Sequence, residues 1–220
     1  MTGWPRSWMR VMAALIPVVI ALQTPATAAA APGTTQVITV AAVGANGAPT
    51  NGYQVTNRLG SPNLSACVRP SPAAVASDIY ACEPAQAAAQ VCWPAQATVL
   101  CMSDPWTMAL RRYPSPGGLR PVDPPPTPMP FALQLDDGTH CILPNGIDWG
   151  GRADGMVPAY GCNPGKTSLA VLIGPGQDPA TAIDRAQPLW MVRVGELGPR
   201  DTPFESPRRR AVAAAWFAGN

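Results

Sequence analysis

Six cysteines constrain this chain more than any other feature of its sequence. They stand at positions 67, 82, 92, 101, 141 and 162 of 220 residues. An even number of cysteines in an oxidising compartment indicates a disulfide framework. Six cysteines allow about 15 connectivities. We predict the sequential set, Cys67–Cys82, Cys92–Cys101 and Cys141–Cys162, in which each bond closes a loop of roughly 10 to 20 residues.

The first 30 residues carry the features of a secretory signal peptide. Arg6 and Arg10 precede an apolar run over residues 11–22, and small residues over 26–31 supply cleavage sites after Ala28 or Ala30. The apolar run is shorter than the about 20 residues needed to span a bilayer. We expect the protein to be secreted or retained in the cell envelope, with no integral membrane segment after processing.

The charge of the chain gives no case for nucleic acid as a partner. Removing Arg6 and Arg10 from the 15 basic residues leaves 13, which equals the number of acidic residues. A neutral chain with scattered charges lacks the basic face that a polyanion requires.

The apolar pattern predicts a mainly β fold of short strands and hairpins, forming a small sandwich or two β modules. We divide the chain into a signal peptide over 1–30, an N-terminal cysteine-bearing half over 31–113, a Pro-rich linker over 114–130 and a C-terminal half over 131–220. The linker holds eight prolines and is typical of polyproline II. Each half is expected to contain a hairpin, over residues 91–102 and over residues 131–143.

The C-terminal residues are expected to form a short helix. Ser206 provides an N-cap, Pro207 occupies the first helical position and Gly219 follows the end. Val212 and Trp216 would then lie on one face, four residues apart. A briefer helix is expected over residues 108–113.

The two halves share an order of landmarks. Cys67 is followed by Tyr80-x-Cys82, and Cys141 is followed by Tyr160-x-Cys162. Two modules of one type are therefore one interpretation, although the different spacings leave two unrelated halves as the alternative.

The chain resembles small exported proteins of mycobacteria and related actinobacteria. The resemblance rests on Val91-Cys-Trp-Pro94, on the run from Thr98 to Trp106, on Leu135-Asp-Asp-Gly-Thr-x-Cys141, on Tyr160-x-Cys162 and on Pro188-Leu-Trp-Met-Val192. It implies secretion and a cysteine framework, and it implies no activity.

Few residues suggest chemistry. The sequence has no Gly-x-Ser-x-Gly elbow, His-Glu-x-x-His motif, P-loop or dinucleotide fingerprint, and no Cys-x-x-Cys pair for zinc, so we predict no cofactor and no metal site. His140, the single histidine, could act as a base beside Asp136 and Asp137, but acids in a turn and a strand histidine explain the same residues.

The glycine-rich loop over residues 148–155 is the better candidate surface, with Trp149, Asp148 and Arg152 as possible binding residues. The leading hypothesis is a non-catalytic exported domain that binds a cell-envelope component or a protein partner. One alternative is a cell-wall hydrolase using His140 or paired acids. The other is an inhibitor-like protein that presents the Cys92–Cys101 loop.

Overall fold

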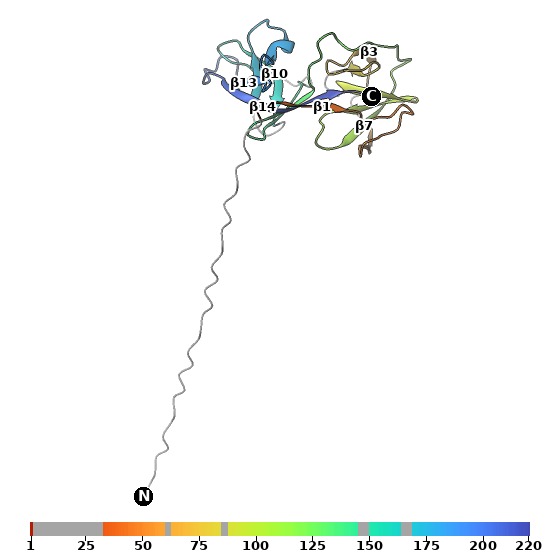
Figure 1. The fold of residues 1–220 in the computed structure, drawn as a ribbon, viewed down its shortest axis with the longest axis horizontal. Coiled ribbons are helices and arrows are strands. Elements are labelled where there is room, and N and C mark those ends of the chain that lie inside the picture. Colours follow the sequence, from red (N-terminus) through yellow and green to blue (C-terminus); the bar gives the residue numbers. More distant parts are fainter. Residues whose placement is uncertain (2–32, 60–62, 85–87, 145–149, 164–168) are drawn as a thin grey trace. The chain divides into compact units, whose positions relative to one another are not determined.

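Six antiparallel strands close into a β-barrel in the C-terminal part of the chain (Figure 1). The computed structural model describes residue 1 and residues 33–59, 63–84, 88–144, 150–163 and 169–220. The barrel closes because β14 pairs with β8 on one edge and with β13 on the other. Its strands are β8 (Ala132–Leu135), β9 (His140–Ile142), β10 (Val157–Cys162), β11 (Leu169–Ile173), β13 (Met191–Glu196) and β14 (Arg208–Ala218). Two further strands extend this sheet, β1 (Gln36–Val40) along β14 and β12 (Ile183–Asp184) along β13.

A second sheet of six strands is formed by the residues that precede the barrel. Its strand order is β2-β7-β6-β5-β4-β3, with β2 parallel to β7 and the other pairs antiparallel. No described strand joins β3 to β2, so this sheet is open, and we call it the open sheet. Its strands are β2 (Gln54–Leu59), β3 (Ala66–Pro70), β4 (Tyr80–Glu83), β5 (Val91–Ala95), β6 (Thr98–Met102) and β7 (Ala109–Pro114).

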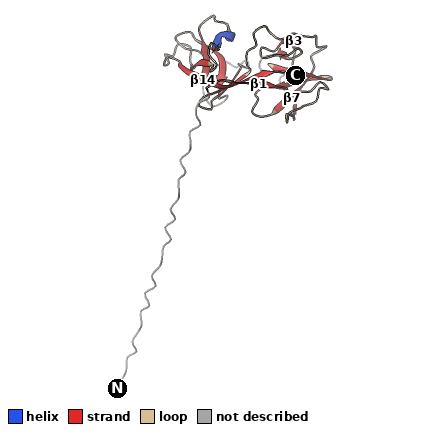
Figure 2. Ribbon diagram, in the orientation of Figure 1, coloured by secondary structure: helices blue, strands red, loops and turns tan. Residues whose placement is uncertain are grey.

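The described residues are therefore almost entirely strand and loop (Figure 2). The helical element among them is a 3-10 turn over Pro179–Ala182, capped by the Asp178 side chain, which accepts a hydrogen bond from Ala180 N. The mainly β prediction is confirmed, and the predicted hairpins are present as β5–β6 and β8–β9.

All three predicted disulfides are confirmed. Cys67–Cys82 joins β3 to β4, Cys92–Cys101 joins β5 to β6, and Cys141–Cys162 joins β9 to β10, with Cα–Cα distances of 4.2, 4.0 and 3.9 Å. Each bond crosses two neighbouring antiparallel strands, where opposite Cβ atoms lie about 4.5–5.5 Å apart. Three disulfides are typical of a protein that matures in an oxidising compartment.

The predicted C-terminal helix is wrong, because residues 208–218 form the long strand β14. The alanine-rich sequence has a high helix propensity, but propensity is a weak prior that tertiary pairing overrides. Here β13, β8 and β1 all hydrogen-bond to this strand. Ala215 and Val212 are fully buried in the barrel. The short helix expected over residues 108–113 is likewise replaced by β7, which pairs with β6 and β2.

The two sheets repeat one another over five strands. In the open sheet Tyr80 lies opposite Cys92, Cys92 opposite Cys101, and Cys101 opposite Arg111. In the barrel the same row reads Tyr160, Val171, Val194, Arg208. The Cys67–Cys82 and Cys141–Cys162 bonds join the first two strands of each series. The landmarks seen in the sequence thus occupy equivalent positions in the two sheets.

One core connects the open sheet to the barrel. Trp93 and Leu100 of the open sheet belong to the same buried cluster as Phe217 of β14. The Trp93 indole donates a hydrogen bond to Gly219 O at 2.9 Å, and Ala218 N donates to Ala73 O at 2.9 Å. Strand β14 therefore belongs to the barrel and also anchors the open sheet.

The Pro-rich segment lies on the other face of the open sheet. Leu119 and Val122 pack on a small cluster that includes both disulfides of this sheet. Tyr80 Oη donates to Arg120 O at 3.0 Å, and Asp78 N donates to Val122 O at 3.0 Å. The segment predicted as a linker thus covers part of the core in addition to connecting the two sheets.

Candidate functional site

The structure places the residues proposed from the sequence in different situations. Asp148 and Trp149 lie outside the described residues, as does the predicted signal peptide apart from Met1. Arg152 is described, and its side chain is only 1% exposed. This residue is therefore buried and is placed to support the structure instead of contacting a ligand directly.

Arg152 connects three segments near one end of the barrel, which contain Asp154, Glu196 and Glu205. Its Nε and Nη2 donate to the Asp154 carboxylate, Nη1 donates to Glu196 O at 2.8 Å, and Nη2 donates to Glu205 O at 2.8 Å. Its guanidinium also lies over the Phe204 ring, 5.4 Å from the centroid. A planar guanidinium with five donors suits this role because its hydrogen bonds have fixed directions. Arg152 thus fixes the end of β13 and the β13–β14 loop, residues 197–207, against each other.

Gly195 leaves room for this arrangement. A Cβ atom at this position would lie 2.9 Å from Leu172 Cδ1 and 3.2 Å from Arg152 Nη1. A side chain here would therefore press on the Leu172 side chain and on the guanidinium. Because Gly195 has no Cβ, the Arg152 guanidinium can pack closely against β13 and bind Glu196 O.

His140 is placed in an aromatic cluster between the two sheets. Its ring stacks on Trp106 with centroids 3.9 Å apart and an interplanar angle of 4°, and Trp106 meets Trp216 edge to face at 5.5 Å. The neighbouring acids Asp136 and Asp137 are both bound to Arg210, at 2.7 and 2.8 Å. The catalytic arrangement considered for His140 needs an oriented acid, and these two acids are engaged elsewhere.

Two carboxyls close to the candidate residues, those of Asp137 and Asp154, have lowered pKa values. Burial alone would raise the pKa of Asp137, but hydrogen bonds from Thr139 and Arg210 outweigh it and lower the pKa. The hydrogen bonds from Arg152 lower the pKa of the exposed Asp154 carboxyl. A general acid of a glycosidase needs a raised pKa, so both residues fit a structural role better.

The Cys92–Cys101 hairpin does not form a free loop. Cys92 is fully buried and Cys101 is 2% exposed. At the hairpin tip, Ala97 O accepts a hydrogen bond from Ser115 N. Gln96 and Ala97 at the tip are exposed, so the tip is accessible although it is hydrogen-bonded to Ser115, the residue after β7.

Three cysteine sulfurs come close together in the open sheet. The Sγ atoms of Cys82, Cys92 and Cys101 all lie within 4.8 Å of one another. Metal ligation by cysteine requires the thiolate, and each of these sulfurs is bonded in a disulfide. In this oxidised form they pack as core atoms.

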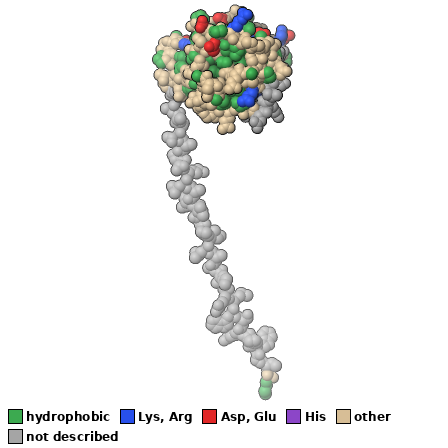
Figure 3. Space-filling view, turned by 90° about the vertical axis from the view of Figure 1, so that its right-hand side faces the viewer, with side chains coloured by type: hydrophobic (Ala, Val, Ile, Leu, Met, Phe, Trp, Pro, Cys, Tyr) green, Lys and Arg blue, Asp and Glu red, His purple; other side chains and the backbone are tan. Residues whose placement is uncertain are grey.

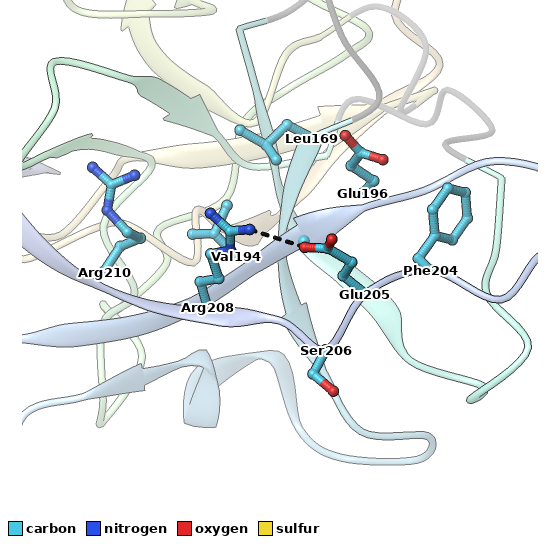
Figure 4. A pocket seen from close by; sticks show the side chains of 9 residues that line it. Leu169, Val194, Glu196, Phe204, Glu205, Ser206, Arg208 and Arg210 are labelled. Atoms are coloured by element: carbon cyan, nitrogen blue, oxygen red, sulfur yellow. Dashed lines mark hydrogen bonds and ion pairs between the residues drawn. The ribbon is translucent and has the colours of Figure 1, made fainter.

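A hollow with converging polar groups lies at one end of the barrel (Figure 4). On antiparallel strands, directly opposite residues point to the same face. Val194 faces the barrel core and lies opposite Arg208, while Glu196 lies opposite Leu169. We call this hollow the barrel mouth. It encloses about 440 Å³ and is lined by Leu169, Val194, Gly195, Glu196, Phe204, Glu205, Ser206, Arg208 and Arg210.

The two arginines of the barrel mouth differ in exposure and in the number of their acidic partners. Arg210 is held by Asp136 and Asp137 of the β8–β9 turn, and its side chain is 30% exposed. Arg208 pairs only with Glu205 among the described residues, at 2.9 Å, and both side chains are about 80% exposed. Arg208 and Glu205 point toward each other in Figure 4. The first arginine is partly enclosed and held by two carboxylates, whereas the second is exposed and has one.

Sequence reasoning missed the barrel mouth because it treated residues 208–217 as a helix. Read as a strand, Arg208 and Arg210 have a period of two and must share a face. That signal was present in the sequence. The contributions of Leu169, Glu196 and Phe204 could not be read in the same way, because only the closed barrel brings them to the same end.

Comparison with known proteins adds no assignment: no family model, curated protein or solved structure matches this chain. Within the described residues, no helix is long and apolar enough to span a membrane. On the face shown in Figure 3, acidic and basic side chains are few and interspersed, so this face carries no patch of a single charge.

Proposed function

We propose that this protein is an exported, non-catalytic binding protein that holds a cell-envelope component in its barrel mouth. The observation that carries the proposal is the hollow of about 440 Å³ at the end of a closed barrel, with charged side chains converging on it. Ligand sites are commonly found in the mouths of β-barrels and hold a few placed polar groups on an apolar lining. Leu169, Val194 and Phe204 supply that apolar lining here.

Export is supported by two independent features. Residues 1–30 have the sequence pattern of a signal peptide, the segment type that directs export. The three disulfides join six buried cysteines and suit an oxidising compartment. An exported protein with a preformed site meets envelope material first, which is why we favour an envelope ligand over an intracellular one.

A binding role also agrees with how the charged groups are used. The acids near His140 are bound to Arg210, and Asp154 is bound to Arg152. Catalysis would require an acid or base with a pKa near the working pH, and the carboxyls with displaced pKa values are lowered instead.

The test is sedimentation of the purified, oxidised protein with isolated cell envelopes of the producing organism. Arg208→Ala should reduce the bound fraction by about fivefold or more, because a charged hydrogen-bonding group is lost. Arg209→Ala is a matched control. It removes the next residue of β14, which faces the other side of the strand and pairs with Asp184 at 3.0 Å. Equal binding by the two variants would contradict a role for the barrel mouth, and binding by neither wild type nor variants would contradict the envelope ligand.

A further inference from the structure

The walls of the barrel mouth are held in place before any ligand arrives. Arg152 binds the backbone of Glu196 on one wall and the backbone of Glu205 on the other, both at 2.8 Å. Its guanidinium also lies over the Phe204 ring. A site fixed in this way loses little conformational entropy on binding, so weak individual contacts suffice for a measurable affinity.

The charges around the barrel mouth disfavour anions. Among the described residues, Arg208 and Arg210 face four carboxylates, which leaves a surplus of two negative charges. The four are Asp136, Asp137, Glu196 and Glu205. Arg210 is already neutralised by its two aspartates, so a phosphate or carboxylate would have Arg208 alone as a counter-ion and would lie near Glu196 and Glu205. Like-charge contacts of this kind are costly.

The surplus of two negative charges would tolerate a cation, but a polycation would also have to pack against Arg208, which has one carboxylate partner among the described residues. Arg208 and Arg210 project from alternate positions of one strand into the hollow. The side chains instead offer guanidinium donors next to carboxylate acceptors, as the Arg208–Glu205 pair in Figure 4 illustrates. Hydroxyl groups can donate to one and accept from the other at the same time.

The lining also offers a flat apolar surface. Phe204 lines the hollow, and Arg152 lies over its ring from within the protein. Leu169 and the largely buried Val194 also belong to the lining. A ligand that combines apolar C–H faces with a rim of hydroxyl groups matches this combination of an aromatic ring and charged hydrogen-bonding groups.

We propose that the barrel mouth binds a neutral, hydroxyl-rich glycan unit, with Phe204 under a sugar ring and the Arg208–Glu205 pair hydrogen-bonded to its hydroxyls. This inference rests on the proposed function and names the ligand class for the same site. The exposed ion pair is the specificity element, since a pair of this kind is weak in water and readily exchanges its mutual bond for bonds to a ligand.

The experiment uses NMR titration of the oxidised protein with three kinds of tetrasaccharide. The neutral arm is a panel of hexose and pentose tetrasaccharides, the anionic arm is a galacturonic acid tetramer and the cationic arm is a glucosamine tetramer. We expect a member of the neutral arm to bind and to shift signals of residues 194–196 and 204–210. Arg208→Ala and Glu205→Gln should each weaken that binding by about tenfold or more, and Arg209→Ala should leave it unchanged.

Phe204→Leu provides a second variant that keeps an apolar side chain over Arg152. It should also weaken neutral glycan binding, while the unfolding midpoint stays near that of wild type. Tighter binding of either charged tetramer, or no binding of any neutral member, would overturn the glycan assignment. If envelope sedimentation still depended on Arg208 in that case, the proposed function would stand and only the ligand class would fail. Loss of that dependence with glycan binding intact would overturn the envelope role alone.

Discussion

The open sheet and the barrel share an arrangement of five strands but stabilise it in different ways. In the barrel, Tyr160 lies opposite Val171 on the next strand, and Val171 lies opposite Val194 on the strand after that. Strand β8 closes the ring by pairing with both β14 and β9. In the open sheet, the equivalent cross-strand partners of Tyr80 are Cys92 and then Cys101. The Cys92–Cys101 disulfide, the second in the open sheet, therefore occupies the position that the Val171–Val194 pair has in the barrel.

The sixth strand explains the difference. Strand β2 occupies the edge of β7 that corresponds to the position of β8, but it runs parallel to β7 and pairs with no other described strand. One face of the open sheet has a small core in which four of the nine buried residues are cysteines. The barrel interior belongs to a much larger apolar cluster, which the other face of the open sheet shares. The comparison teaches that disulfides and the Pro-rich cover substitute for closure.

The largest expected effect concerns the Cys92–Cys101 bond. We expect the Cys92→Ala/Cys101→Ala double variant to lower the free energy of unfolding by about 3–5 kcal/mol, because it removes a cross-link and leaves a cavity in a small core. The Cys141→Ala/Cys162→Ala variant should lose less, about 2–3 kcal/mol, since closure of the barrel remains. Urea unfolding followed by circular dichroism measures both.

Loop entropy alone predicts the opposite order of stability losses for the two disulfide variants, so the experiment distinguishes the two explanations. The barrel bond spans 21 residues and the open-sheet bond spans 9, so the barrel bond would contribute more if cross-linking of the unfolded chain were the whole effect. A Cys92→Val/Cys101→Val variant, which copies the valine pair of the barrel, should recover about 1–2 kcal/mol relative to the alanine pair. A greater loss in the barrel variant would contradict our account.

The equivalent tyrosines give the next largest effect. Tyr160 is fully buried and donates to Pro130 O at 2.9 Å, whereas Tyr80 donates to Arg120 O at 3.0 Å under the Pro-rich segment. Substitution by phenylalanine leaves each carbonyl without this donor. We expect Tyr160→Phe to cost about 1–2 kcal/mol, because its acceptor is buried within the barrel, and Tyr80→Phe to cost about 1 kcal/mol or less.

These tyrosines also predict alkaline sensitivity. Burial and the neighbouring Asp78 carboxylate raise the pKa of Tyr80 from 10.0 to about 12, and burial raises the pKa of Tyr160 as well. A raised pKa means that the folded state keeps its proton longer, so the contribution is complete below pH 10 and is lost as the pH rises from 10 through 12. Urea midpoints at about pH 9 and about pH 11 should differ less in each phenylalanine variant than in wild type.

The cysteine pairing and the hairpins could be predicted from the sequence because both are local. Asp136-Asp137-Gly138 joins two short apolar runs, and Cys92 and Cys101 lie in adjacent strands of a tight hairpin. In such cases turn chemistry determines the register. The matching of Tyr80 with Tyr160 could also be anticipated, since it needs only the order of landmarks along the chain.

Closure of the barrel and the site at its mouth could not be predicted in this way. Residues 208–218 have an alanine-rich sequence that favours a helix locally, and the strands that override this preference lie far away in the chain. Arg152 looked like an exposed loop residue because a glycine-rich loop is usually at the surface. Its burial depends on backbone carbonyls of Glu196 and Glu205, more than 40 residues away.

The smallest expected effect compares two polar contacts at the surfaces of the sheets. Asp137, in the turn that lets β8 close the barrel, accepts a hydrogen bond from Thr139 N at 2.9 Å and pairs with Arg210. Glu83 at the edge of the open sheet pairs only with Arg69 among the described residues, and both side chains are more than half exposed. We expect Asp137→Asn to cost about 0.5–1 kcal/mol and Glu83→Gln to cost nothing measurable.

Acid titration separates these two carboxylates. The hydrogen bonds from Thr139 and Arg210 outweigh burial and lower the pKa of Asp137 below 3.8. A lowered pKa stabilises the fold above the ordinary value, and that contribution is lost as the pH falls below it. The cost of Asp137→Asn, measured by urea unfolding at about pH 7, should therefore shrink at about pH 3. An equal cost at both pH values, or a larger cost for Glu83→Gln, would show that the turn does not help to hold the barrel closed.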